Sequence, residues 1–217
     1  EREQTYINLK ENLRKFGKSA LVRGTGFGKS FMLVRLCGEY KSVLFLYPNA
    51  KLKNEVMKNH TSFKIGGKAD YFVTCDNVDT LKALICELAR IEMPYFILGK
   101  GSNLLVSDKG VEGAVISLSG FDKIDVFEDK ITCGAGVSLA KLCTTACENC
   151  LSGLEFAYGI PGSVGGALYM NAGAYGGEMS QVVASATVMS KNGEIYNIDV
   201  NDMQLGYRTS AFKQNGD

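Results

Sequence analysis

The segment from Gly153 to Gly177 contains eight glycines and constrains the fold of this chain more than any other feature. Glycine inside a helix or strand costs about 0.5–1 kcal/mol relative to alanine, so this density favours sharp turns or close backbone approaches. Apolar neighbours such as Leu154, Phe156 and Ile160 argue against a flexible polar linker. The segment predicts a buried turn whose bare N–H groups suit a large cofactor with a phosphate bridge. A tight turn between two packed elements is the alternative.

Length and charge bound the class of protein. A chain of 217 residues has room for one large or two modest domains. Its 24 basic and 23 acidic residues leave a net charge of +1, which gives no electrostatic reason to expect binding to nucleic acid or membrane. No apolar run approaches the ~18–20 residues of a membrane span, and the N-terminus does not read as a signal peptide. We expect a cytoplasmic monomer, and the missing initiator methionine suggests a fragment.

The seven cysteines are an odd number and show no disulfide framework, which fits a reducing compartment. Cys143, Cys147 and Cys150 are spaced four and three apart, as on one face of a helix. A metal site would need a fourth ligand, and the only histidine, His60, is distant in sequence. We therefore expect these cysteines to pack as small apolar side chains rather than to bind a metal.

Residues 20–47 read as strand, glycine loop, Gly-Lys-Ser, helix and strand, the order of a phosphate-binding P-loop. In such a loop Gly28, Lys29 and Ser30 would hold ATP phosphates, with the lysine neutralising charge and the serine binding Mg²⁺. Residues 1–50 resemble the start of the first motor domain of superfamily 2 helicases. Arg23 departs from the pattern, and no acidic Mg²⁺ motif follows. An orphaned βαβ fragment that binds nothing tightly is the alternative.

Residues beyond Pro48 interleave helices and strands without strict βαβ order, which suggests an α+β domain. Asn77 is a candidate N-cap for a helix with Leu81, Leu84, Ile85 and Leu88 on one face. A second helix is expected over 137–147, and Asn192-Gly193 predicts a hairpin turn between runs at 182–190 and 195–200. Further strands are expected at 71–73, 95–98, 114–118, 123–127 and 130–133.

Four motifs in this part of the chain resemble one family. They span 59–70, 98–105, 153–174 and 206–212, and they follow the order of UDP-N-acetylenolpyruvoylglucosamine reductases. These flavoenzymes make UDP-N-acetylmuramate for bacterial peptidoglycan. The resemblance implies an α+β, two-lobed FAD-binding domain of the vanillyl-alcohol-oxidase (PCMH) type over residues 54–217. The P-loop-like fragment over 1–50 would precede it, and the family's C-terminal substrate domain would be absent.

The same resemblance implies which residues hold FAD. The loop Gly99–Leu105 would wrap the pyrophosphate, while 134–136 and 159–166 would line the flavin and its ribityl chain. The residues expected to bind the cofactor are Gly99, Gly101, Ser102, Asn103, Leu104, Ala135, Gly136, Gly159, Ile160, Pro161, Gly162, Ser163, Gly165, Gly166, Asn171, Ala172 and Gly173.

The family's reaction implies further roles. NADPH supplies a hydride that reaches the enolpyruvyl carbon of a UDP-sugar by way of the flavin. Arg208 matches the arginine that polarises the substrate carboxylate, although a surface or salt-bridged arginine is the alternative. The family's catalytic serine and glutamate do not follow before Asp217, so we expect this chain to be inactive alone. Glu155 belongs to the FAD-loop motif and is not assigned as the acid.

Two other functions remain open from the sequence. One is a P-loop, ATP-binding, helicase-like fragment, and the other is a non-catalytic scaffold with vestigial loops. The two resemblances meet near residues 50–56, where either a natural fusion or an artefactual join would account for them.

Overall fold

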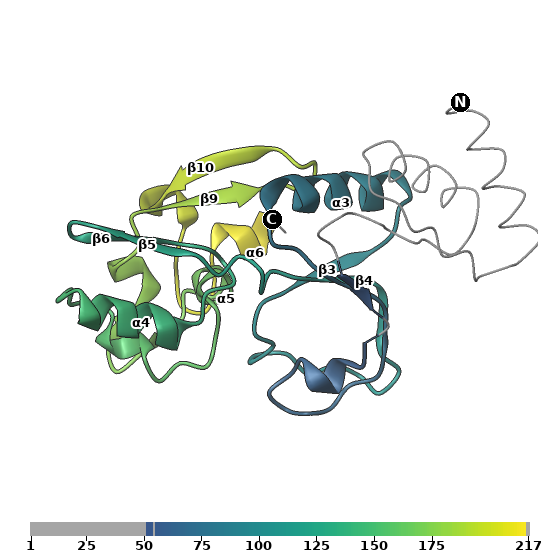
Figure 1. The fold of residues 1–217 in the computed structure, drawn as a ribbon, viewed down its shortest axis with the longest axis horizontal. Coiled ribbons are helices and arrows are strands. Elements are labelled where there is room, and N and C mark those ends of the chain that lie inside the picture. Colours follow the sequence, from purple (N-terminus) through teal and green to yellow (C-terminus); the bar gives the residue numbers. More distant parts are fainter. Residues whose placement is uncertain (1–50, 54, 216–217) are drawn as a thin grey trace, which may run out of the picture. The chain divides into compact units, whose positions relative to one another are not determined.

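The structure is a computed structural model that describes residues 51–53 and 55–215 (Figure 1). The chain divides into two units, Glu1–Leu52 and Lys53–Asp217. The predicted phosphate-binding residues Gly28, Lys29 and Ser30 lie outside the described residues. The P-loop and the assignment of residues 1–50 as a separate domain therefore stay predictions.

The first lobe of the described part is built on a four-stranded sheet. Its strand order is β1-β2-β4-β3, and both β2 and β3 pair in parallel with the central strand β4. β2 and β3 therefore run in the same direction on either side of β4, and α3 supplies the crossover that connects them. The elements are β1 (Lys51–Lys53), η2 (Met57–Asn59), β2 (Ala69–Thr74), α3 (Val78–Arg90), β3 (Tyr95–Leu98) and β4 (Val111–Ser117).

Helix α3 forms as the sequence predicted. The Thr80 N–H donates to the Asn77 side-chain oxygen at 2.8 Å, which caps the first turn. Leu84, Ile85 and Leu88 are buried on one face, while Leu81 is only half-buried. The apolar stripe thus fixes which side of α3 packs inward.

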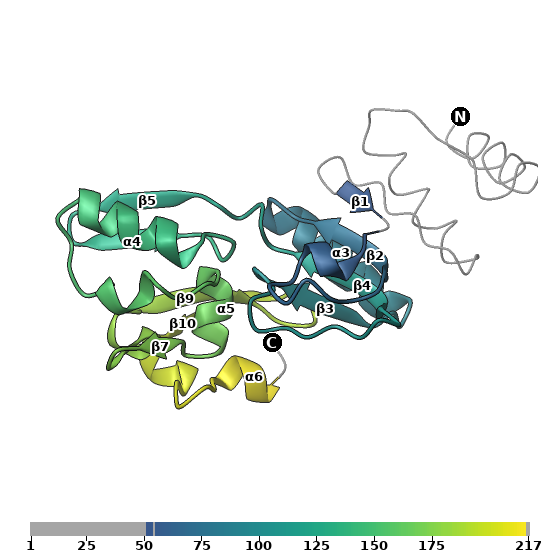
Figure 2. The same ribbon diagram turned by 90° about the horizontal axis from the view of Figure 1, so that it is seen from below.

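The second lobe contains short helices and three hairpins. Figure 2 shows these elements grouped apart from α3 and its sheet. One apolar cluster joins α4 to the glycine-rich segment and includes Val137, Leu139, Leu142, Phe156 and Met179. The elements are β5 (Ile124–Phe127), β6 (Lys130–Cys133), α4 (Leu139–Glu148), η3 (Glu155–Ala157), α5 (Val164–Tyr169), β7 (Gly173–Ala174), β8 (Gly177–Glu178), η4 (Met179–Gln181), β9 (Ser185–Met189), β10 (Ile195–Asp199), η5 (Val200–Met203) and α6 (Ala211–Asn215).

The β9–β10 hairpin confirms the predicted Asn-Gly turn. Its strands pair antiparallel, and Gly193 takes a φ of +77°, which glycine adopts without strain. The tip reaches α3, because the Cys86 thiol donates to the Asn192 carbonyl oxygen at 3.8 Å (Figure 1). A Cβ at Gly193 would lie 2.9 Å from the Cys86 sulfur. A side chain at position 193 would therefore disturb this contact between hairpin and helix.

The prediction that Cys143, Cys147 and Cys150 pack as small apolar side chains was wrong for two of them. Cys143 is buried and its thiol donates to the Leu154 carbonyl oxygen at 3.2 Å, whereas Cys147 and Cys150 are exposed. Helix α4 ends at Glu148, so Cys150 falls beyond the face that the spacing suggested. Within residues 55–215, no group of three or more metal-ligating side chains is present.

Thiol alkylation should separate the exposed from the buried cysteines. Burial, with a smaller contribution from Asp76, raises the pKa of the Cys75 thiol to about 11. Alkylation needs the thiolate, so a thiol with a pKa of about 11 is almost entirely in its unreactive form at pH 8, and burial also restricts access to it. We expect iodoacetamide to label Cys147 and Cys150 on the order of 100-fold faster than Cys75, as followed by mass spectrometry. Equal rates at these positions would contradict the burial of Cys75.

Candidate functional site

The loop after β3 packs directly onto the 59–70 motif. Gly101 has a φ of +63°, and a Cβ there would lie 1.9 Å from the carbonyl oxygen of His60. The Ser62 N–H donates to the Gly101 carbonyl oxygen at 3.1 Å. Only glycine accommodates both the positive φ and the close approach. The loop after β3 and the 59–70 motif therefore pack directly against each other.

Four consecutive N–H groups in this loop face no acceptor among residues 51–53 and 55–215. Across the described residues, the amides of Lys100–Asn103 donate no hydrogen bond. Backbone N–H groups are normally paired, with protein, water or ligand. A run of free amides on a loop between two packed elements suits the oxygens of a phosphate group.

The glycine-rich segment packs against residues 134–139. The Leu139 N–H donates to the Gly162 carbonyl oxygen at 3.1 Å, and the Gly165 N–H donates to the Ala135 carbonyl oxygen at 2.9 Å. A Cβ at Gly136 would lie 2.1 Å from the Leu118 carbonyl oxygen. These glycines therefore permit backbone segments to touch, as their density in the sequence indicates.

The turn predicted to be buried in this segment is buried only in part. Gly165 and Gly166 lie inside helix α5, and Gly159, Pro161 and Gly166 are exposed. A residue larger than glycine would not fit at position 165 of the helix, because a Cβ there would lie 2.9 Å from the Ala135 Cβ. Contact with a neighbouring segment thus outweighs the helix-propensity cost of glycine.

The two predicted cofactor loops meet. Ser163 is 2% exposed, and a Cβ on Gly99 would lie 2.5 Å from its hydroxyl oxygen. A Cβ on Gly162 would lie 3.9 Å from the Ser102 hydroxyl oxygen. The structure therefore brings together Gly99 and Ser102 from one lobe with Gly162 and Ser163 from the other, and Gly99 has no room for a side chain.

A cavity of about 280 Å³ lies at the carboxyl ends of β3 and β4. Ligands of open parallel sheets bind at this end of the strands. Lys64 and Lys100 bring two positive charges to its wall. The Ser117 hydroxyl donates to that of Ser119 at 3.0 Å. The other lining residues are Asn59, His60, Thr61, Ser62, Leu98 and Gly99.

Sequence reasoning missed Ser117 and Ser119 as part of this wall. The available signal was their position at and just beyond the end of a parallel strand. Leu104, predicted to bind the cofactor, is half-buried and packs on the cluster of Met57, Phe72 and Val106, which anchors the loop.

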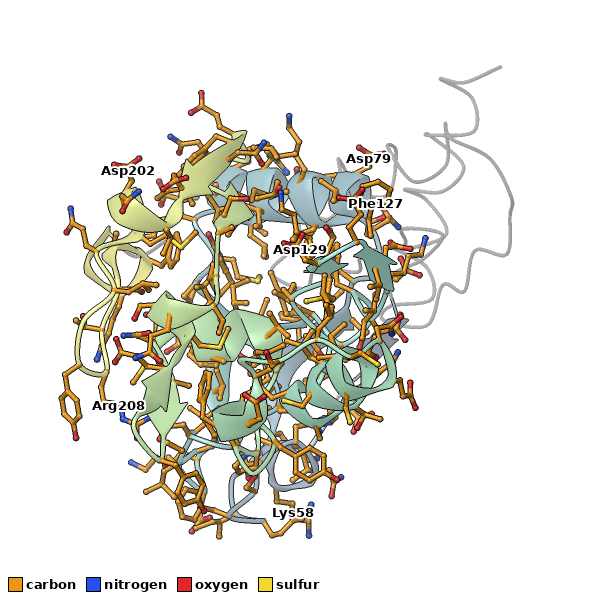
Figure 3. The ribbon with its side chains drawn as sticks, turned by 90° about the vertical axis from the view of Figure 1, so that its left-hand side faces the viewer. Lys58, Asp79, Phe127, Asp129, Asp202 and Arg208 are labelled. Carbon is orange, nitrogen blue, oxygen red and sulfur yellow. The ribbon has the colours of Figure 1, made fainter. Side chains whose placement is uncertain are left out.

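Arg208 lies on a tight turn at the surface. The Gly206 and Thr209 N–H groups donate to each other's carbonyl oxygens at 3.1 and 3.3 Å, and Arg208 between them has a φ of +55°. Its side chain is exposed (Figure 3), and within residues 55–215 it forms no ion pair. The guanidinium is therefore available to an anionic ligand.

Asn171, Ala172 and Gly173 follow α5 and lie away from solvent or half-buried. The Asn171 side chain donates to the Gly206 carbonyl oxygen at 3.1 Å and accepts from the Ser180 N–H at 3.0 Å. Gly173 sits in β7, where a Cβ would lie 2.7 Å from the Gly177 carbonyl oxygen. Their predicted role in cofactor binding stays a prediction.

The fold and these loops define a class. A family model described as an FAD binding domain matches residues 69–199, more than half of the chain. The chain therefore belongs to the FAD-binding-domain family. The tight glycine contacts and the free amides fit such a group, because both leave backbone exposed to a phosphate-bearing ligand.

Within that class, the chain is similar to proteins that share one description. UDP-N-acetylenolpyruvoylglucosamine reductase of Clostridium tetani is 52% identical over 163 residues, which cover 75% of this chain and 53% of that protein. The crystal structure of the reductase from Thermus caldophilus is 35% identical with a TM-score of 0.64, over 74% of this chain and 57% of that one. The chain thus spans about half the length of the curated relatives it matches. The resemblance read from the motifs is confirmed.

A more distant structure supports the fold alone. p-Cresol methylhydroxylase is 18% identical with a TM-score of 0.50, over 66% of this chain and 30% of that one. The predicted PCMH-type FAD-binding fold is therefore confirmed. Across the described residues, no helix has the length and apolar character needed to cross a membrane.

Proposed function

We propose that the protein containing this chain is an FAD-dependent reductase that uses NADPH to convert UDP-N-acetylenolpyruvoylglucosamine to UDP-N-acetylmuramate. The observation that carries the proposal is the meeting of Gly99 with Ser163, which joins the two predicted cofactor loops in a chain 52% identical to such a reductase. Bound FAD would supply the hydride-carrying ring. We also propose that the protein acts in the bacterial cytoplasm and as a monomer, since both loops come from one chain.

Roles for the chain's own residues follow from their positions. The free amides of Lys100–Asn103 would bind the pyrophosphate oxygens, and Lys64 and Lys100 would offset their charge. Because Gly99 and Gly162 have no side chains, the surface between the lobes would be flat enough for a planar ring. The exposed guanidinium of Arg208 would bind the carboxylate of the UDP-sugar and stabilise negative charge that develops on it.

Substrate titration of the FAD-loaded full-length protein that contains this chain tests this function. Adding UDP-N-acetylenolpyruvoylglucosamine should perturb the flavin absorbance, and Arg208→Ala should weaken that binding by about 10- to 100-fold, as expected for loss of a hydrogen bond to a charged group. Arg90→Ala is the matched control, because Arg90 is an exposed arginine of α3 paired with Glu87. Equal losses in the two variants, or none in Arg208→Ala, would contradict the role of Arg208.

A further inference from the structure

Arg208 depends on contacts made by the segment that ends the glycine-rich region. Its turn is closed by the two backbone hydrogen bonds between Gly206 and Thr209, and Arg208 itself sits at positive φ. Non-glycine residues rarely adopt this conformation, which costs roughly 1–2 kcal/mol. The surrounding structure must therefore hold the turn in place.

Two partly buried side-chain hydrogen bonds hold it, and the exposed Lys213 ammonium also donates to the Arg208 carbonyl oxygen at 3.4 Å. The Asn171 amide donates to the Gly206 carbonyl oxygen at 3.1 Å, and the Ser210 hydroxyl donates to the Tyr169 carbonyl oxygen at 2.7 Å. Asn171 is 3% exposed and Ser210 is fully buried. The bonds flank Arg208 on both sides, and both lead to residues 169–171 at the end of α5.

The carbonyl end of the Asn171 side chain also has a hydrogen-bond partner. Its carbonyl oxygen accepts from the Ser180 N–H at 3.0 Å, while the Ser180 hydroxyl donates to the Glu178 carboxylate. The backbone of Asn171 has a φ of +41°, a region that asparagine tolerates better than most residues. One buried amide thus ties the Arg208 turn, the start of η4 and the end of α5 together.

We propose that Asn171 is a positioning residue that holds the Arg208 turn at a fixed place relative to the cofactor loop. This role is distinct from the direct cofactor contact expected for Asn171 from the sequence, and it rests on the protein partners of both its amide donor and its carbonyl acceptor. Only the purpose of holding Arg208 for a substrate rests on the proposed function. The hydrogen bonds themselves are present in the chain whatever its activity.

Three variants of the full chain separate the two ends of the amide. Asn171→Gly removes the side chain while keeping a residue that accepts positive φ. Asn171→Asp keeps the acceptor for Ser180 and loses the donor to Gly206. Hydrogen bonds from the Ser180 hydroxyl and from Asn171 lower the pKa of Glu178, so this aspartate would face a second carboxylate. It is therefore made together with Glu178→Gln, and Glu178→Gln alone is the control.

Amide hydrogen exchange and FAD titration are measured on each variant. In Asn171→Gly we expect the amides of Ser180, Gly206 and Thr209 to exchange about 3- to 10-fold faster, as for loss of single hydrogen bonds. In the double variant only Gly206 and Thr209 should exchange faster, with Ser180 still protected. General destabilisation would not produce that partial rescue.

The FAD dissociation constant should stay within about threefold of the unsubstituted chain in all three variants. Unchanged exchange at Gly206 and Thr209 in Asn171→Gly would overturn the positioning role, and so would a large loss of FAD affinity. Failure of the unsubstituted chain to bind FAD would instead contradict the proposed function, while the exchange pattern would still decide the role of Asn171.

Discussion

Replacing Gly101 by alanine is expected to weaken FAD binding by at least about 100-fold. The new Cβ would lie 1.9 Å from the His60 carbonyl oxygen, a backbone atom that no side-chain rotation can move away. The φ of +63° adds the cost of a left-handed residue. The loop must then leave the 59–62 segment, which displaces the free amides of Lys100–Asn103. Fluorescence titration of FAD measures the loss.

Gly176→Ala is the matched control for that experiment. Gly176 also has positive φ, at +85°, but no atom lies within 4 Å of the Cβ position. The control therefore carries the conformational cost without the clash and should bind FAD within about threefold of the unsubstituted chain. If both alanines lose affinity equally, the close packing at Gly101 is not what shapes the loop.

Alanine substitutions at the adjacent glycines of α5 should have opposite effects on stability. At Gly165 the Cβ would lie 2.9 Å from the Ala135 Cβ, and overpacking of this kind costs about 1–3 kcal/mol. At Gly166, which is exposed, the nearest atom is the Ser163 hydroxyl oxygen at 3.4 Å. There alanine should gain about 0.5–1 kcal/mol of helix stability. Urea unfolding of the FAD-free chain measures both changes.

Alanine at position 166 should have opposite effects on the stability of the FAD-free chain and on its affinity for FAD. If FAD lies against this face of α5, a methyl group at the exposed position 166 would occupy its space and weaken binding by about tenfold or more. Gly166→Ala should therefore be more stable without FAD and bind FAD less well. A variant that is stabilised and binds FAD normally would place the cofactor away from α5.

Local chemistry was enough to predict most elements of the fold. The Asn77 cap and the stripe of Leu84 and Leu88 define α3, and the Asn192-Gly193 pair defines the β9–β10 turn. The sheet order was not predictable in this way, because β4 enters between β2 and β3 through pairings distant in sequence. Such pairings depend on packing of the whole lobe rather than on local propensity.

The candidate site, like the fold, could be predicted only where local sequence chemistry decides the structure. Glycine density predicted close backbone contacts, and the structure supplies a partner for Gly101, Gly136 and Gly165. It did not predict helix α5, because local propensity disfavours glycine there and only contact with Ala135 explains it. The part played by Asn171 was equally inaccessible, since its partners Ser180 and Gly206 lie 9 and 35 residues away.

Amide hydrogen exchange of the full chain with and without FAD tests the central claim most directly. If the two loops form one FAD cradle, the cofactor should slow exchange at Lys100–Asn103 and at Gly162–Ser163 together, at one FAD per chain. Exchange in α3, which lines neither loop, should not change. Saturating FAD that protects neither loop, or only one of them, would contradict the account.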